Sequence, residues 1–148
     1  MPKQSYMRDC FASLAMTLIR TAMDNAKKKI LIVDDEPDIV TMIQMRLEAG
    51  GYAVISASDG NNGYAKAKSE NPDLIILDVM LPGMDGYKVC RLLKFDQKYK
   101  HIPVIMLTAK GGKEDQDLSL QVGANLFLNK PPELKELLAK VNELLNLP

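Results

Sequence analysis

The chain has 148 residues, of which 47% are hydrophobic and 26% are charged, and this composition is typical of one globular domain. Its 19 basic and 19 acidic residues cancel, which argues against a protein that coats nucleic acid or an anionic membrane. Its 2 cysteines are too few for a disulfide framework or a four-cysteine zinc site. With so few cysteines we expect a reducing, cytoplasmic setting. We also expect no membrane insertion, because no apolar run reaches the ~20 residues that span a bilayer.

The first 26 residues differ in pattern from the rest of the chain. Several apolar residues there recur at the spacing of a short amphipathic helix, namely Met7, Phe11, Leu14 and Leu18. A signal peptide is disfavoured, because the apolar stretch is short and no A-x-A cleavage pattern follows it. We therefore expect residues 1–26 to be an N-terminal extension, poorly ordered or folded as a short helix, and residues 27–148 to form the domain.

From residue 27 onward, short apolar runs alternate with helical patterns, which is typical of an α/β fold with a parallel sheet. The five runs that predict strands are Ile30–Val33, Tyr52–Ala57, Leu74–Leu77, Val104–Leu107 and Leu126–Leu128. The first, third and fourth runs are almost continuously apolar, which predicts strands that are buried on both faces.

Five helical patterns follow these runs, one after each predicted strand. In the first, Val40, Ile43 and Leu47 share one face, and Gly50-Gly51 supplies the stop. The other patterns lie at residues 64–67, 89–93, 113–122 and 134–145. The sequence thus predicts five β/α units.

The polar side chains that suggest a site follow the first, third, fourth and fifth predicted strands. They are Asp34, Asp35 and Glu36 after the first strand, Asp78 after the third, Thr108 after the fourth, and Asn129 and Lys130 after the fifth. Ligands of open parallel sheets bind beyond these strand ends, where clustered carboxylates repel one another and attract a hard cation such as Mg²⁺. A lysine and a hydroxyl beside an attacking carboxylate suit a phosphoryl group. Any one of these aspartates could instead be a helix N-cap, but the whole set favours a phosphoryl site.

Several segments resemble the response-regulator receiver domain of two-component signalling, over residues 28–145. The matching segments are Ile30–Glu36, Asp59-Gly60, Asp73–Gly86, Pro103–Ala109, Gly123-Ala124 and Lys130-Pro131. The resemblance implies a flavodoxin-like, doubly wound five-stranded parallel sheet with strand order 2-1-3-4-5 and five helices. It also implies a cis peptide bond between Lys130 and Pro131.

The resemblance further implies that Asp78 is the phosphoacceptor. The phosphoryl group would come from the phosphohistidine of a histidine kinase or of a phosphotransfer protein. Mg²⁺ would be the cofactor, bound by the side chains of Asp35 and Asp78 and the backbone carbonyl of Met80, with Asp34 placed to help through water. Such a module is not an enzyme in the usual sense, since it catalyses only its own phosphorylation and dephosphorylation.

Two further residues match the family's switch. Thr108 would move to bond one phosphoryl oxygen while Lys130 pairs with another, and Phe127 would turn its ring inward. The alternative for Phe127 is a plain core aromatic. The sequence departs from the commonest pattern at Leu126, where many members carry Asp, and at Pro132, where Phe is usual. We expect Pro132 to lie in the first turn of the last helix.

Phosphorylation would then change the face formed by the fourth helix (113–122), the fifth strand (126–128) and the fifth helix (134–145). A downstream protein, or a second copy of the chain, would bind there. We recognise no output segment in the sequence and expect a stand-alone receiver that acts through protein contact, without binding DNA directly.

Three other functions fit the sequence less well. A phosphohydrolase of the haloacid-dehalogenase type needs an Asp two residues after its nucleophile, where this chain has Met80, whose thioether cannot move a proton. A flavodoxin would need phosphate-binding donors after the first strand, where Asp34, Asp35 and Glu36 would repel phosphate. A receiver-like module that is never phosphorylated would not need Asp78, Thr108 and Lys130 together.

Overall fold

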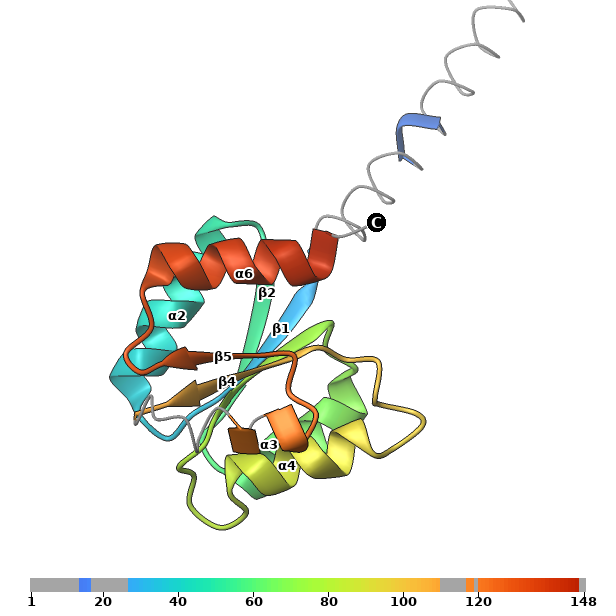
Figure 1. Ribbon diagram of the computed structural model, residues 1–148. Coiled ribbons are helices and arrows are strands. Elements are labelled where there is room, and N and C mark those ends of the chain that lie inside the picture. The colour runs from blue at the N-terminus through green and yellow to red at the C-terminus, as the bar shows by residue number, and fades with distance from the viewer. Residues whose placement is uncertain (1–13, 17–26, 110–116, 119, 147–148) are drawn as a thin grey trace, which may run out of the picture.

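The computed structural model describes residues 14–16, 27–109, 117–118 and 120–146 (Figure 1). Its helices and strands are, in chain order, β1 (Lys29–Val33), α2 (Pro37–Ala49), β2 (Ala53–Ala57), α3 (Gly60–Glu70), β3 (Leu74–Asp78), α4 (Gly86–Lys94), β4 (Val104–Thr108), β5 (Leu126–Asn129) and α6 (Leu134–Asn146). Residues 117–118 and 120–121 are also helical, so helical structure follows each of the five strands, as predicted. The start of the predicted fourth helix lies outside the described residues.

The five strands form one parallel sheet in the order β2-β1-β3-β4-β5, which confirms the predicted topology. Figure 1 shows α2 and α6 on one face of the sheet and α3 and α4 on the other. Because all strands run the same way, their carboxyl ends share one edge, and the order reverses between β1 and β3 at that edge.

The sheet is buried on both faces at its centre, as its apolar runs predict. Residues 30–33 of β1 have no exposed surface, and every residue of β3 and β4 is buried. Leu31 and Val33 pack against α3 and α4, whereas Ile30 and Ile32 pack against α2 and α6. This alternation follows from the period of two along a strand. The core therefore holds the strand ends, and with them the polar residues, in fixed positions.

Local signals set the helix limits. The Asp59 side chain accepts a hydrogen bond of 2.7 Å from the Asn62 backbone N–H and so begins α3. Gly50 follows the last residue of α2, as predicted. The prediction for Pro132 was wrong. The Glu133 carbonyl accepts the first bond of α6, from Leu137 N–H at 2.9 Å, so Pro132 precedes the first turn.

Two glycines allow the loop between β3 and α4 to fold over the sheet edge. A Cβ on Gly86 would lie 2.1 Å from the carbonyl oxygen of Asp78, and a Cβ on Gly60 would lie 1.7 Å from that of Met84. Each glycine follows an aspartate that caps a helix, Asp59 for α3 and Asp85 for α4. The Asp-Gly pairs therefore start each helix and make room for the loop at the same point.

The N-terminal segment is described only at residues 14–16, which are helical. The boundary at residue 26 and the nature of the extension thus remain predictions. Among the helices that the structure describes, none is both long enough and apolar enough to cross a membrane.

Candidate functional site

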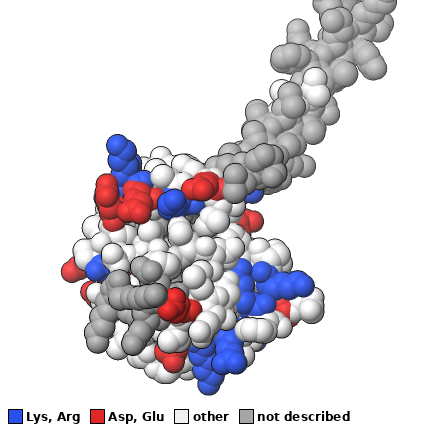
Figure 2. Space-filling view, in the orientation of Figure 1, with Lys and Arg blue, Asp and Glu red and all other residues white. Residues whose placement is uncertain are grey.

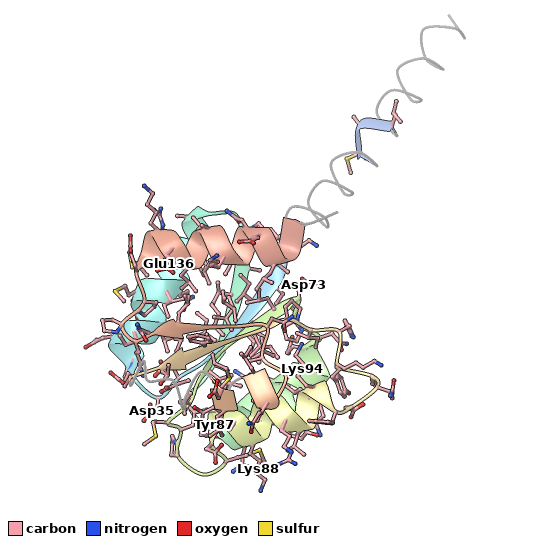
Figure 3. All side chains as sticks on the ribbon, viewed as in Figure 1. Asp35, Asp73, Tyr87, Lys88, Lys94 and Glu136 are labelled. Carbon is pink, nitrogen blue, oxygen red and sulfur yellow. The ribbon has the colours of Figure 1, made fainter. Side chains whose placement is uncertain are left out.

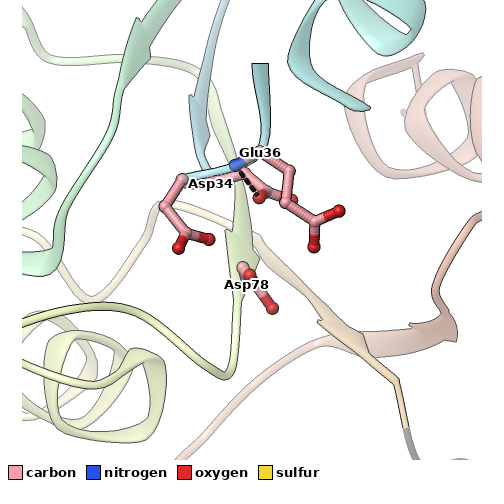
Figure 4. A group of neighbouring side chains, drawn as sticks. Asp34, Glu36 and Asp78 are labelled. Carbon is pink, nitrogen blue, oxygen red and sulfur yellow. Dashed lines mark hydrogen bonds between the residues drawn. The ribbon is translucent and has the colours of Figure 1, made fainter. Parts of the chain in front are cut away.

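The carboxyl edge of the sheet brings four carboxylates together. Asp34 directly follows β1 and Asp78 is the last residue of β3, and each is only 2% exposed. Asp35 and Glu36 follow in the exposed turn into α2. One oxygen from each of these four residues lies within 4.8 Å of the others. Figure 4 shows Asp34, Glu36 and Asp78 around the end of β3.

Lys130 supplies the positive charge of this cluster. Its backbone N–H donates to the Thr108 carbonyl at 2.8 Å, which extends the pairing of β4 and β5 by one residue. Its Nζ lies 2.9 Å from Asp78 Oδ2, 2.7 Å from Glu36 Oε1 and 3.1 Å from Asp34 Oδ1. The Lys130–Pro131 bond is cis, as the resemblance implied. One ammonium group thus serves three carboxylates.

This arrangement shifts two pKa values. Burial raises the pKa of Asp78, and the charge of Asp34 adds to the rise, although bonds from Lys130 and from the Met80 N–H oppose it. Burial alone would lower the pKa of Lys130, but its hydrogen bonds to Glu36, Asp78 and Asp34 outweigh that effect and raise it. The surroundings therefore favour the protonated, cationic form of Lys130 and disfavour the ionised form of Asp78.

The cluster fits a hard divalent cation. Asp34 Oδ1 accepts from the Glu36 N–H at 2.9 Å and from Lys130. Asp34 Oδ2 lies 3.0 Å from Lys130 Nζ, yet it is buried and, within the described part of the chain, receives no hydrogen bond. An unsatisfied buried oxygen beside three further carboxylates offers the hard ligands that Mg²⁺ prefers. The chemistry of the donors therefore fits the metal that the sequence suggested.

The other predicted residues lie around this cluster. The Met80 backbone N–H donates to Asp78 Oδ1 at 3.2 Å, and its side chain is 74% exposed. Thr108 ends β4 one residue beyond Leu107, the partner of Asp78 in the sheet, and it is buried. Phe127 is partly buried on the side of α3 and α4. All predicted site residues thus lie at or near one sheet edge.

Glu36 is a site residue that the sequence did not reveal. The sequence places it among the acidic residues after the first strand, but no role in the site was predicted for it. In the structure its carboxylate makes the shortest contact with Lys130. Its position directly after Asp35 was the available signal, but the path of the chain into α2 decides which way the side chain points.

An open cleft of about 670 Å³ lies beside the acidic cluster, between α2 and α3. Asp34 and Asp35 line its end nearest the sheet edge, and Ser56, Asn62 and Lys66 line its other walls. The Lys66 ammonium donates to the Ser56 carbonyl at 2.5 Å. The cleft gives solvent and ligands access to Asp35, the exposed member of the sheet-edge aspartates.

Comparison with known proteins places these features in a family. Residues 30–142 match the family model of the response regulator receiver domain. The chemotaxis response regulator CheY4 of Vibrio cholerae has a similar structure, with a TM-score of 0.75 and 34% sequence identity. That match covers 80% of this chain and 99% of the other.

Two curated relatives are more similar in sequence. The alkaline phosphatase synthesis transcriptional regulatory protein PhoP of Bacillus subtilis is 49% identical over 118 residues, which are 80% of this chain and 48% of PhoP. The DNA-binding dual master transcriptional regulator RpaA of Synechocystis sp. is 45% identical over 117 residues, which are 79% of this chain and 48% of RpaA. The chain spans about half the length of these relatives, so the expectation of a stand-alone receiver is not confirmed.

Proposed function

This chain belongs to the response regulator receiver domain family, and from that premise we propose that it accepts a phosphoryl group on Asp78 and passes on a two-component signal. The family implies a histidine kinase as the partner upstream. One observation carries the choice of residue. Asp78 is the buried carboxylate at the end of a central strand that lies 2.9 Å from the Lys130 ammonium, beside three further carboxylates.

The proposed step is the transfer of a phosphoryl group from a histidine nitrogen of the donor to a carboxylate oxygen of Asp78. A carboxylate oxygen of Asp78 forms a bond to phosphorus as the bond between phosphorus and the donor histidine breaks, and the electron pair returns to the imidazole. Asp78 attacks in its ionised form, so transfer is expected at pH values above its raised pKa. The Lys130 ammonium, which contacts Asp78 before the transfer, would then pair with an oxygen of the phosphoryl group.

Receiver domains use Mg²⁺, and the acidic cluster supports the same cofactor here. We infer that the side chains of Asp35 and Asp78 and the carbonyl of Met80 hold the ion, with Asp34 acting through water. When bound, Mg²⁺ neutralises negative charge on the phosphoryl oxygens. Asp34 and Asp78 are buried on one side of this site, whereas Asp35 is exposed to solvent on the other.

We infer that the phosphoryl group acts on the rest of the domain through Thr108 and Phe127. The Thr108 hydroxyl would turn to a phosphoryl oxygen, and the Phe127 ring would move into the vacated space. A shift from about 1% to 99% of the active form needs ~5.5 kcal/mol of differential binding. A few charge-assisted hydrogen bonds of roughly 1.5–3 kcal/mol each would supply it. The changed face would comprise residues 117–121, β5 and α6, and a downstream protein or a second copy would bind there.

We further infer that these 148 residues act through protein contacts and not by binding DNA. RpaA is described as a DNA-binding regulator, but the match covers only 48% of it. The equal numbers of basic and acidic residues here give no general attraction to phosphate backbones. Retention of a DNA duplex at low salt, lost in proportion to added salt, would contradict this inference.

Phosphorylation by a small phosphodonor, phosphoramidate, tests the site assignment. The parent chain should gain the mass of one phosphoryl group with Mg²⁺ present and slowly or not at all in excess chelator. Asp78→Asn should gain none, because an amide cannot attack phosphorus. Asp73→Asn, at the other end of β3, is the matched control and should behave as the parent. Full phosphorylation of Asp78→Asn would show that another residue is the acceptor.

Hydrogen exchange tests the switch separately. Beryllofluoride, a phosphoryl mimic, should change the exchange of residues 108–132 in the presence of Mg²⁺. Changes confined to α2 and α3 would place the switch elsewhere and leave the phosphoacceptor assignment intact.

A further inference from the structure

The outer face of α4 carries apolar side chains that the domain does not cover. Val89, Cys90 and Leu93 face the core and are buried. On the opposite side, Lys88, Arg91, Leu92 and Phe95 follow one another at intervals that place them on one face of the helix. Phe95 is 72% exposed and Leu92 is 38% exposed. Phe95 and Leu92 thus form a small exposed apolar patch on the helix surface.

Two grooves flank this ridge. One, of about 670 Å³, lies between α4 and α3 and is lined by Tyr64, Leu92 and Phe95, among others. The other, of about 420 Å³, lies between α4 and the helical residues after β4, with Leu118 and Val122 in its wall. Arg91 and Leu92 line both grooves. The ridge and its grooves thus form one continuous surface across α4.

Several cationic side chains lie around this surface. The Lys68 ammonium lies 4.2 Å from the centre of the Tyr64 ring, and the Arg91 guanidinium lies 6.0 Å from that of Phe95. Lys88 and Lys98 are exposed nearby. Figure 2 shows lysine and arginine side chains gathered over this lower and right-hand part of the molecule.

Two acids that line these grooves, Asp85 and Asp96, accept hydrogen bonds from the backbone. Asp85 accepts a bond from the Lys88 backbone N–H at 2.9 Å, and Asp96 accepts one from the Lys98 backbone N–H at 2.8 Å. Both therefore stabilise backbone at the ends of α4. In the described ranges of the chain, no carboxylate forms an ion pair with Lys68, Lys88, Arg91 or Lys98. These cationic groups are therefore available to the carboxylates of a partner, although Asp85 and Asp96 keep their negative charges beside them.

We propose that this α4 surface, made of Tyr64, Lys68, Lys88, Arg91, Leu92 and Phe95, binds an acidic amphipathic helix of a partner protein. The apolar face of such a helix would pack on Leu92 and Phe95 and lie in a flanking groove. Its carboxylates would pair with the surrounding cations, which sets orientation and speeds association. The surface shares no residue with the acidic cluster, and one of its grooves includes Leu118, which lies in the face that we expect phosphorylation to change.

A titration followed by nuclear magnetic resonance of the labelled full chain tests this proposal. The probe is a synthetic helical peptide with Leu and Phe three and four residues apart and glutamates on its other faces. A second peptide has lysines in place of the glutamates. The acidic peptide should shift signals of residues 86–98 and 117–122, and the basic peptide should not. Added salt should weaken binding.

Matched variants locate the contact. Lys88→Glu with Arg91→Glu should weaken binding by about tenfold, as loss and reversal of exposed ion pairs imply. Phe95→Ala should also weaken it. The controls are Lys135→Glu and Met45→Ala, which alter an exposed lysine on α6 and an exposed methionine on α2, and these should bind as the parent does.

Other outcomes would overturn the proposal. They are equal binding of both peptides, binding of neither, shifts centred on β5 and α6, or shifts of α4 signals with protein concentration alone, which would assign the surface to a second copy. Phosphoramidate labelling of the Lys88→Glu, Arg91→Glu variant should stay at the level of the parent. The docking surface and the phosphoacceptor can therefore fail independently.

Discussion

Aspartate and lysine residues lie at both ends of the central strands, but in different environments. At the amino end, Asp73 is exposed and accepts a bond of 2.7 Å from the Lys29 backbone N–H, and the Lys29 ammonium pairs with Glu70 at 3.1 Å in contact with solvent. At the carboxyl end, the Lys130 ammonium is shared by three carboxylates, two of which are almost fully buried. Figure 3 shows Asp73 and Asp35 at these opposite ends.

The difference separates charges that serve the fold from charges that serve the site. At the amino end each charged group has its own partner and water nearby, so each contact is worth little and costs little. At the carboxyl end negative groups outnumber the positive group and two of them are removed from water, an arrangement that is poor for stability. Such crowding is typical of functional sites, where a ligand relieves it.

The largest effect on stability is expected from removing Lys130, and removal of Lys29 is the comparison. Lys130→Met should lower the free energy of unfolding by about 3 kcal/mol at pH 7 in metal-free buffer, because it leaves buried carboxylates without a cation. Lys29→Met should lower it by no more than about 0.5 kcal/mol, because its ion pair is exposed. Urea denaturation of both variants measures the contrast, and equal losses would remove the distinction between the two ends.

A smaller effect of opposite sign is expected from Asp78→Asn. Removing one of the crowded charges should raise the free energy of unfolding at pH 7 by an amount on the order of 1–2 kcal/mol. The effect should depend on pH. The pKa of Asp78 is raised in the folded state from its usual 3.8, so the folded parent holds its proton at pH values where the unfolded chain has lost it.

Stability contributed by protonated Asp78 is therefore fully present below pH 3.8 and is lost as pH rises through the raised pKa. The difference between Asp78→Asn and the parent should widen from pH 3.8 up to the raised pKa and stay constant at pH values above it. Denaturation curves at a series of pH values measure this difference. A difference that does not vary with pH would mean that Asp78 is not destabilised by burial and crowding.

A small loss, opposite in sign to the effect of Asp78→Asn, is expected at Asp73. Asp73→Ala should cost about 1 kcal/mol, since it removes one exposed hydrogen-bond acceptor from the start of β1. Denaturation should show a loss, in contrast to the gain at Asp78. A gain in stability at Asp73 would show that the aspartates at the two ends of β3 do not differ in the way proposed.

The sequence predicted the fold well because its signals were local. The continuous apolar runs marked β1, β3 and β4, and the residues directly after them marked the site edge. The glycine after α2 marked where that helix ends. Pro132 misled because a proline next to a helix fits both the first turn and the position before it, and only the hydrogen bond to the Glu133 carbonyl decides between them.

The contacts within the site were harder to predict. The sequence placed Asp34 and Asp78 at the ends of central strands but did not predict that both are buried. That Glu36 contacts Lys130 depends on how the chain turns into α2 and on a side chain that reaches over from β5, and neither leaves a periodic signal. The cationic surface of α4 was also missed, because its members come from two helices and only the packing of α3 beside α4 brings them together.

The central claim is that the carboxyl edge holds excess negative charge that a cation at Asp78 relieves. The most direct test is the free energy of unfolding of the parent and of Asp78→Asn as Mg²⁺ is added. The parent should start lower and gain about 2.7 kcal/mol when Mg²⁺ reaches one hundred times its Kd. Asp78→Asn should start higher and gain far less over the same range. Equal gains in both proteins, or no gain in the parent, would contradict the claim.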